Sequence, residues 1–503
     1  MLFCAVLYLR TARLSVIIVD EIYYRKVAQN LNTADEKFHR MTEEPLNRLT
    51  WELAVPTVIT MLVTAAYNMA DTFFVGRIGT EATAGVGLIL PVMTIIQAIG
   101  FFFGQGSGNF ISRALGAKDL SHAERMASTG GICAALFGGI ILAGGMIFRG
   151  ALLSLLGARS GLVDDATVRY AGDYLTFILC GAPFMCLSCG LNNQLRFQGN
   201  AVFAMIGLVS GAVLNCVLDP IFIFVFGLEA KGAAMATMIS QIVSCALLFI
   251  GTLRSDSLKI KLKNFTPSAY YLKNICIGGF PSLCRQALAS LAALCLNAAA
   301  GSSVPSDLAE EAIAAFSIVN KIVLLIFSAV IGFGQGFQPI CGFNYGAKKY
   351  DRVWNAYTYC LKYGSIFLVF MAAFGFAFAP QLVSLFRDDA DVIAFGTKAL
   401  RLQCLAIPFM AMITLTNMMY QSMGRVLGAS VLAAARQGLV FIPAVLILPK
   451  LFANAVYGVY LAQPVADLCA FIIALPMAVK VYREFKAVDF GMKLSGCGAS
   501  AGA

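Results

Sequence analysis

The chain has 503 residues, of which 59% are hydrophobic and 13% are charged, and its formal net charge is +10. Soluble domains are on average about 45–50% apolar and about 25% charged, so this composition excludes an ordinary soluble protein, a disordered chain and a disulfide-rich secreted scaffold. Lys and Arg collect in the cytoplasmic loops of membrane proteins, so the positive charge is no argument for nucleic-acid binding.

The first 44 residues precede the first long apolar segment. Residues 1–24 are moderately apolar but are interrupted by Arg10 and Arg13, and no basic region precedes them. They therefore fit neither a signal peptide nor a membrane span. We interpret residues 1–44 as a cytoplasmic extension, and we expect translation to start at Met41 and residues 1–40 to be dispensable.

Twelve apolar segments follow, and each is long enough for a helix that crosses a membrane, which needs about 20 mostly apolar residues. Alternate connections and both tails hold most of the 37 Lys and Arg residues, so both termini are expected in the cytoplasm. The predicted segments are 50–76, 83–111, 123–149, 168–192, 201–226, 232–253, 273–300, 311–340, 353–380, 393–421, 427–450 and 456–480.

The two halves of the chain repeat each other. The Pro-Phe-Met sequence at 183–185 recurs at 408–410, and the Gly-Gln-Gly sequence at 104–106 recurs at 334–336. Several matches in near-constant register indicate an internal duplication. The predicted fold class is therefore an all-α polytopic membrane protein with twelve transmembrane helices in two pseudo-symmetric six-helix lobes.

We place the N-lobe at 45–255, a basic cytoplasmic inter-lobe loop at 256–272, the C-lobe at 273–485 and a cytoplasmic tail at 486–503. Transporters with such repeats commonly bind their substrate near the repeat interface and alternate access by rocking. The glycine motifs lack the G-x-x-x-x-G-K-[ST] pattern of a phosphate loop, so we interpret them as flexible connections between the second and third segments of each half.

Carboxylates inside membrane spans cost a few kcal/mol or more, so they are functional candidates by default. Asp71 ends a polar stripe with helical spacing on the first segment, which is expected to line a bundle interior or a water-filled cavity. The alternative is that the hydroxyls are satisfied by their own helix and that Asp71 lies at the headgroup level. The other members of the stripe are Thr57, Thr60, Thr64 and either Tyr67 or Asn68.

A second polar group lies on the fifth and sixth segments. Asn215 and Asp219 share a helix face, and Thr237 lies on the next segment. Carboxylate, amide and hydroxyl oxygens are hard ligands that suit Na⁺ or a proton and do not suit soft metals. Prolines inside spans kink and weaken a helix, so they are candidate hinges. These candidate hinges are Pro56, Pro220 and Pro281.

Over about residues 45–485 the chain resembles the multidrug and toxic compound extrusion (MATE) family. The resembling stretches are Tyr67 to Gly76, Asn215 to Thr237, Phe197 to Asn200 and the Gly-Ala-Lys motifs at 116–118 and 346–348. The resemblance implies a transporter and not an enzyme, which exports varied, often cationic and amphipathic compounds in exchange for H⁺ or Na⁺ by alternating access. It further implies a multi-pass protein of a bacterial plasma membrane, working as a monomer and without any cofactor besides the coupling ion.

Carried over residue by residue, the resemblance implies an N-lobe cation site at Asp71, Asn215, Asp219 and Thr237. No other metal site is expected. Some branches also have acids in the seventh and tenth helices, which this sequence lacks, and this favours a MepA-like branch coupled through the N-lobe alone. The predicted substrate-cavity residues are Met61, Thr64, Tyr67, Asn68, Asn192 and Gln241.

Two other functions remain as alternatives. A lipid-linked oligosaccharide flippase of the same superfamily would be expected to show a strongly basic cavity, whereas the intramembrane cations here are few: Arg285, Lys321 and Arg436. An intramembrane hydrolase would need an Asp pair or a Ser–His dyad, but both histidines lie outside the apolar segments. The sequence leaves open the substrate range, the choice of ion and the roles of Asp467 and Arg285.

Overall fold

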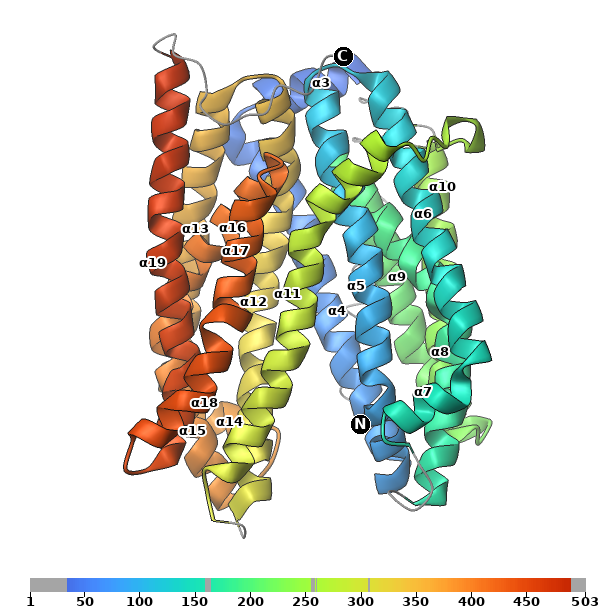
Figure 1. Ribbon diagram of the computed structural model, residues 1–503, viewed down its shortest axis with the longest axis vertical. Coiled ribbons are helices and arrows are strands. Elements are labelled where there is room, and N and C mark those ends of the chain that lie inside the picture. Colours follow the sequence, from blue (N-terminus) through green and yellow to red (C-terminus); the bar gives the residue numbers. More distant parts are fainter. Residues whose placement is uncertain (1–33, 159–163, 255–257, 259, 306–307, 490–503) are drawn as a thin grey trace.

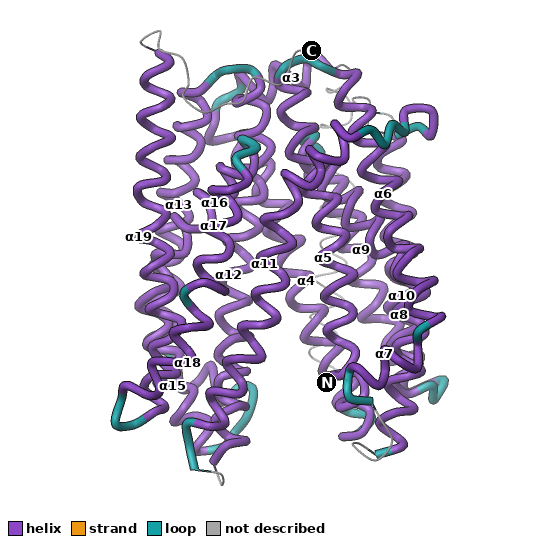
Figure 2. Tube along the Cα trace, viewed as in Figure 1, coloured by secondary structure: helices purple, strands orange, loops and turns teal. Residues whose placement is uncertain are grey.

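The computed structural model describes residues 34–158, 164–254, 258, 260–305 and 308–489. Nearly all of these residues are helical, and none of them forms a strand (Figure 2). Twelve of the described helices are long and apolar enough to cross a membrane, which confirms the predicted all-α fold class. Most of the predicted N-terminal extension and tail, at 1–33 and 490–503, lies outside the described residues.

The N-lobe contains the first six membrane-spanning helices. Its fifth span changes from an α-helix to the π-helical turn η2 directly after Pro220. The short helix α7 (Arg149–Leu155) follows the third span. The spans are α4 (Leu46–Gly76), α5 (Thr80–Gly116), α6 (Leu120–Ile147), α8 (Asp165–Phe197), α9 (Ala201–Pro220) with η2 (Ile221–Val225), and α10 (Glu229–Arg254).

The C-lobe repeats this plan, with two of its spans interrupted by non-α turns. The short helices η3 (Leu262–Asn264) and α14 (Ala379–Ser384) lie outside the spans. The spans are α11 (Ala269–Ser302), α12 (Ala309–Gly346), α13 (Tyr350–Ala377), α15 (Ala390–Ala406) with η5 (Ile407–Phe409) and α16 (Met410–Ser422), α17 (Val426–Ala434) with η6 (Ala435–Leu439) and α18 (Phe441–Leu451), and α19 (Ala455–Asp489).

Most of the helices extend several residues beyond the apolar segments that predicted them. The second segment, predicted at 83–111, is a helix from Thr80 to Gly116, and the seventh, predicted from 273, begins at Ala269. Hydropathy marks the part of a helix that lies in the hydrocarbon, whereas backbone hydrogen bonding continues into the polar turns at each end.

The two lobes meet at one end of the molecule and diverge toward the other (Figure 1). They pack through α4 and α5 on one side and α11 and α12 on the other. The close contacts involve the first halves of α4 and α11 and the second halves of α5 and α12. We call this closed end, where helix α3 (Ala34–Glu43) also lies, the α3 end.

The paired Gly-Ala-Lys motifs form the tightest part of the α3 end. A Cβ at Gly116 would lie 2.1 Å from the carbonyl oxygen of Phe343, and a Cβ at Gly346 would lie 2.1 Å from that of Arg113. Each glycine therefore lets its helix end touch the backbone of the other lobe. Lys118 and Lys348 both have φ of 59°, so the two turns share one conformation as well as one sequence.

The Gly-Gln-Gly motifs differ from the prediction. They do not form flexible connections but lie inside α5 and α12, where all six residues are buried. A Cβ at Gly106 would lie 2.3 Å from the carbonyl oxygen of Ile275 in the other lobe. Glycine is used here for close helix packing and not for loop flexibility, and a sequence motif alone does not distinguish the two uses.

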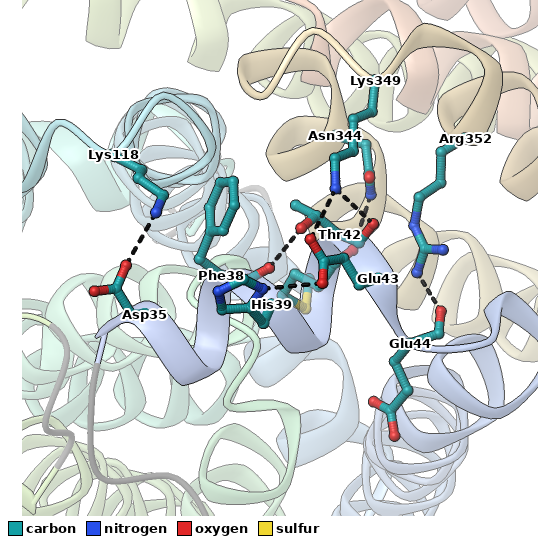
Figure 3. A network of polar contacts seen from close by, with 11 residues as sticks. Asp35, Phe38, His39, Thr42, Glu43, Glu44, Lys118, Asn344, Lys349 and Arg352 are labelled. Atoms are coloured by element: carbon teal, nitrogen blue, oxygen red, sulfur yellow. Dashed lines mark hydrogen bonds and ion pairs between the residues drawn. The ribbon is translucent and has the colours of Figure 1, made fainter.

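Helix α3 lies across the α3 end and contacts both lobes (Figure 3). Asp35 forms an ion pair of 3.1 Å with Lys118 of the N-lobe. On the C-lobe side, Asn344 Nδ2 donates to the carbonyl oxygen of Met41 at 3.0 Å, and Lys349 contacts Glu43 at 3.3 Å. Hydrogen bonds from His39 and then Lys349 hold the pKa of Glu43 below its ordinary value, so Glu43 stays charged at neutral pH.

Candidate functional site

The polar stripe on α4 serves two purposes. Near the α3 end, Thr57 Oγ1 lies 2.6 Å from the carbonyl oxygen of Gly332, so it contacts the other lobe. Farther along, Thr60 and Thr64 donate to carbonyls of their own helix at 2.8 and 2.7 Å. These hydroxyls are satisfied locally, as the alternative interpretation expected, but the last part of the stripe lines a cavity.

That cavity, the N-lobe pocket, lies between α4, α5, α8, α9 and α10. It brings together five of the six predicted substrate-cavity residues, and it also includes Asn215 and Thr237 of the predicted cation site. Its lining is mostly apolar with a few convergent amides and hydroxyls, which is the usual make-up of a small-molecule site. The lining residues are Met61, Thr64, Tyr67, Asn68, Gln97, Phe101, Met185, Cys189, Leu208, Gly211, Ala212, Asn215, Thr237, Ser240, Gln241 and Ser244.

Asn192 does not line this pocket, in contrast to the prediction. Its side-chain amide is buried and donates to the carbonyl oxygen of Ala204 at 2.9 Å. Asn417, the equivalent residue of the second repeat, makes the corresponding bond to Ala429 at 2.6 Å. Both asparagines tie one helix to the beginning of the next, so this position is structural in both lobes.

Two of the polar side chains that α10 contributes to the pocket, those of Ser240 and Ser244, were not predicted from the sequence. Ser240, Gln241 and Ser244 follow Thr237 at helical spacing and face the same cavity. Gln241 is hydrogen-bonded to Ser188 at 3.1 Å. The spacing was visible in the sequence and is the signal that would have identified Ser240 and Ser244.

Asn215 joins the members of the predicted cation site. Its Nδ2 lies 3.3 Å from Asp219 Oδ1 and 3.3 Å from Thr237 Oγ1. Asp219 has no exposed surface, and its helix α9 packs against α4, the helix that carries Asp71. Asn215, Asp219 and Thr237 therefore come together beside the N-lobe pocket, and Asp71 lies on the adjacent helix α4.

Three oxygen atoms of this group are buried and accept no hydrogen bond from any described residue: Asp71 Oδ1, Asn215 Oδ1 and Asp219 Oδ2. Buried acceptors are normally satisfied, and those that are not call for an explanation. Carboxylate and amide oxygens that accept no hydrogen bond are able to take up a proton or a hard cation. The N-lobe thus has an acidic, oxygen-lined position beside a mostly apolar pocket.

The candidate hinge prolines have different local structures. Pro56 and Pro281 are buried inside continuous helices, α4 and α11. Pro220 ends α9, and the π-helical turn η2 follows it. Their role as hinges stays a prediction.

Comparison with known proteins places the chain in a family. The MatE family model matches residues 56–221 and 286–446. The multidrug export protein MepA of Staphylococcus aureus (strain MSSA476) is 28% identical over 474 residues, which cover 92% of this chain and 100% of that protein. MepA of Staphylococcus saprophyticus is 27% identical over 466 residues, with the same shares covered.

A solved structure described as the outward-facing conformation of a multidrug resistance MATE family transporter of the MOP superfamily is also similar. It has a TM-score of 0.82 and 26% identity, and the match covers 90% of this chain and 98% of that one. Because the family model alone matches more than half of the residues, the chain belongs to the MatE family, the multidrug and toxic compound extrusion family that its motifs resemble.

Proposed function

We propose that this membrane transporter exports chemically varied, often cationic and amphipathic compounds in exchange for H⁺ or Na⁺. The names of its relatives, which are multidrug export proteins, support the export of small molecules. The single observation that carries the coupling is the group of three donor-free buried oxygens beside the N-lobe pocket. Such a group attracts a cationic drug when it is ionised and loses that attraction when a coupling ion neutralises it.

The orientation of the chain follows from its charges. The turns and connections at the α3 end carry a cluster of basic side chains, and basic loops face the cytoplasm. We therefore assign the α3 end and both termini to the cytoplasmic side of a bacterial plasma membrane. The described conformation, with its lobes packed at the α3 end, is then outward-facing. The basic residues are Lys118, Arg125, Lys261, Lys263, Lys348, Lys349 and Arg352.

The cycle then has two half-steps. With Asp71 and Asp219 ionised, the N-lobe pocket takes up a cationic compound from the cytoplasm or the inner leaflet. After the lobes rock to the outward-facing state, H⁺ or Na⁺ occupies the oxygen site, α4 bends at Pro56 and the compound is released. For useful coupling, the bound drug and the bound ion need only weaken each other's binding by about 1–3 kcal/mol.

The first test is efflux of a fluorescent cation such as ethidium from bacteria that lack their own pumps. Wild type is compared with Asp71→Asn and Asp219→Asn at matched expression. We expect both variants to lose most of the efflux, because each removes one carboxylate of the site. Asp165→Asn is the control, since it neutralises an exposed acid of α8 that does not line the pocket. Wild-type efflux by both variants would contradict the proposal.

Proteoliposomes separate the two coupling ions. An imposed pH gradient without Na⁺ is compared with an imposed Na⁺ gradient at equal pH on both sides. Uptake driven by only one gradient identifies the ion. Substrate cleavage in this assay would favour the hydrolase alternative, and movement of a lipid-linked sugar without any drug efflux would favour the flippase, which the relatives do not support.

A further inference from the structure

Arg285 is an unpaired cation inside a membrane-spanning helix. It lies in α11, is half-buried, and forms no hydrogen bond or ion pair with any other described residue. A charged side chain at such a position is costly, so it normally pairs with an opposite charge or faces a cavity that serves a function. Arg436, the neighbouring intramembrane arginine, already has such a partner in Asp467 at 2.7 Å.

Both arginines face a cavity of the C-lobe, the C-lobe pocket. Arg285 and Arg436 together carry two positive charges and Asp467 carries one negative charge, so one positive charge is left uncompensated. Thr414 and Gln437, which also line this pocket, form no side-chain hydrogen bond with the described residues and are free to donate one. The lining residues are Arg285, Phe327, Ile331, Ile413, Thr414, Asn417, Leu432, Ala433, Arg436 and Gln437.

The internal duplication relates this pocket to the N-lobe pocket. In the register of the repeated Pro-Phe-Met motif, Cys189 corresponds to Thr414. The same register pairs Gly211 with Arg436, and each of these four residues lines the pocket of its own lobe. The two lobes thus have cavities at corresponding positions.

The charges of the two pockets are opposite. In that register, the acids Asp71 and Asp219 correspond to Leu296 and Ala444, whereas Arg285 corresponds to Thr60. The N-lobe has acids where the C-lobe has apolar residues, and the C-lobe has a cation where the N-lobe has a hydroxyl. A substrate that reaches both lobes therefore meets a negative site on one side and a positive site on the other.

We propose that the C-lobe pocket binds a carboxylate group of the exported compound through Arg285, with Thr414 and Gln437 as neutral donors. This inference rests on the proposed export function and extends its substrate class from cations to zwitterions. The planar guanidinium donates two parallel hydrogen bonds to a carboxylate. A single net positive charge matches one carboxylate, whereas a doubly charged phosphate would need a second free cation.

The test uses a carboxy-rhodamine dye and its methyl ester, which share the cationic ring system and differ only in the carboxylate. Binding of each dye to the detergent-purified full chain is followed by fluorescence polarisation, for wild type and for Arg285→Gln. We expect the substitution to lower the affinity for the carboxylate dye by roughly 10- to 100-fold. The affinity for the ester is expected to fall by less than about twofold. Lys321→Gln is the matched control, because it removes an exposed cation of α12 that does not line the pocket.

Arg285→Lys keeps the charge but not the planar fork, so its affinity for the carboxylate dye is expected between those of wild type and Arg285→Gln. If Arg285→Gln does not fold, the proposal is tested by comparing the affinities of wild type and Arg285→Lys for the two dyes. The proposal is overturned if Arg285→Gln lowers the affinity for both dyes equally or for neither. It is also overturned if the wild type shows no saturable binding of the carboxylate dye. A wild type that binds the two dyes as expected in vitro and yet exports no ester from cells would count against the export function and leave the C-lobe site standing.

Discussion

Asp467 differs from the N-lobe acids because its carboxylate is fully satisfied. It has no exposed surface and accepts hydrogen bonds from Arg436 at 2.7 Å, Gln403 at 3.0 Å and Gln463 at 3.1 Å. Asp71 and Asp219, in contrast, each have an oxygen that no described residue donates to. We therefore interpret Asp467 as the structural partner of Arg436 and not as a second coupling acid.

This interpretation predicts a stability effect for Asp467→Asn. The substitution leaves Arg436 buried without its carboxylate, and breaking a buried ion pair from one side costs about 3–5 kcal/mol. We expect a clearly lower Tm of the detergent-purified protein. Asp219→Asn is the control, because that carboxylate has no cationic partner among the described residues and its neutralisation costs little. A wild-type Tm combined with abolished efflux in Asp467→Asn would instead make Asp467 a coupling acid.

The sequence predicted which side chains lie close together where both residues are on the same face of one helix. Asn215 and Asp219 lie one helical turn apart on α9, so their proximity follows from helix geometry alone. Asn192 was placed in the cavity by resemblance, but its amide reaches the backbone of Ala204 on the following helix. Which of two faces a buried polar side chain uses depends on the neighbouring helix, and a sequence does not show that neighbour.

The ion pairs by which α3 links the lobes are exposed, so removing its first residues is expected to have a modest effect. The Asp35–Lys118 and Glu43–Lys349 pairs are solvent-accessible, and water and salt screen such pairs so that each contributes little to stability. Lys118 also lies 4.5 Å from the ring centroid of Phe38. A chain starting at Met41 loses Asp35 and Phe38 but keeps the contacts of Met41 and Glu43.

We predict that a chain starting at Met41 inserts and transports, but populates the state open at the α3 end a few times more often. A chain starting at Ala34 is the matched control, because it keeps the whole of α3. The measurement is the distance between spin labels on unnatural amino acids at the exposed positions Leu120 and Asp351. Identical distance distributions for the two chains would mean that α3 contributes nothing to closure, and failed insertion of the shorter chain would show that residues 34–40 are required.

The repeated Pro-Phe-Met motif shows that similar sequences form different helices in the two lobes. Helix α8 continues through Pro183, whereas the helix breaks into the turn η5 around Pro408. In the N-lobe, a Cβ at Gly138 would lie 2.6 Å from Pro183 Cα, so α6 packs directly against the proline. In the register of the Gly-Ala-Lys motifs, Gly138 corresponds to Leu368, so the second lobe has a large side chain where the first has a glycine. The close approach of α6 to Pro183 therefore depends on a residue that the second repeat does not have.

Alternating access requires the two lobes to separate at the α3 end, and the paired glycines determine how closely they pack there. Gly116→Ala places a methyl group 2.1 Å from a backbone oxygen of the other lobe. Overpacking of this kind costs about 1–3 kcal/mol. We predict that Gly116→Ala and Gly346→Ala shift the protein toward the state open at the α3 end and lower efflux.

The same label pair, at Leu120 and Asp351, measures this shift as a longer mean distance. Gly139→Ala is the control, since a Cβ at Gly139 meets no atom within 4 Å. If Gly116→Ala kept both the wild-type distance and wild-type efflux, the closed α3 end would not be a state that the transport cycle depends on.

The sequence by itself determined the twelve spans, the duplication and the proximity of Asn215 and Asp219. Each of these depends on local chemistry: the length of apolar runs, the recurrence of motifs, and spacing along one helix. Only the tertiary structure decided that the Gly-Gln-Gly motifs are packing surfaces and that Asn192 faces a backbone carbonyl. It also decided that Arg285 has no partner among the described residues while Arg436 has Asp467. These facts depend on which helices lie side by side, and contacts between residues far apart in the chain leave no periodic signal in the sequence.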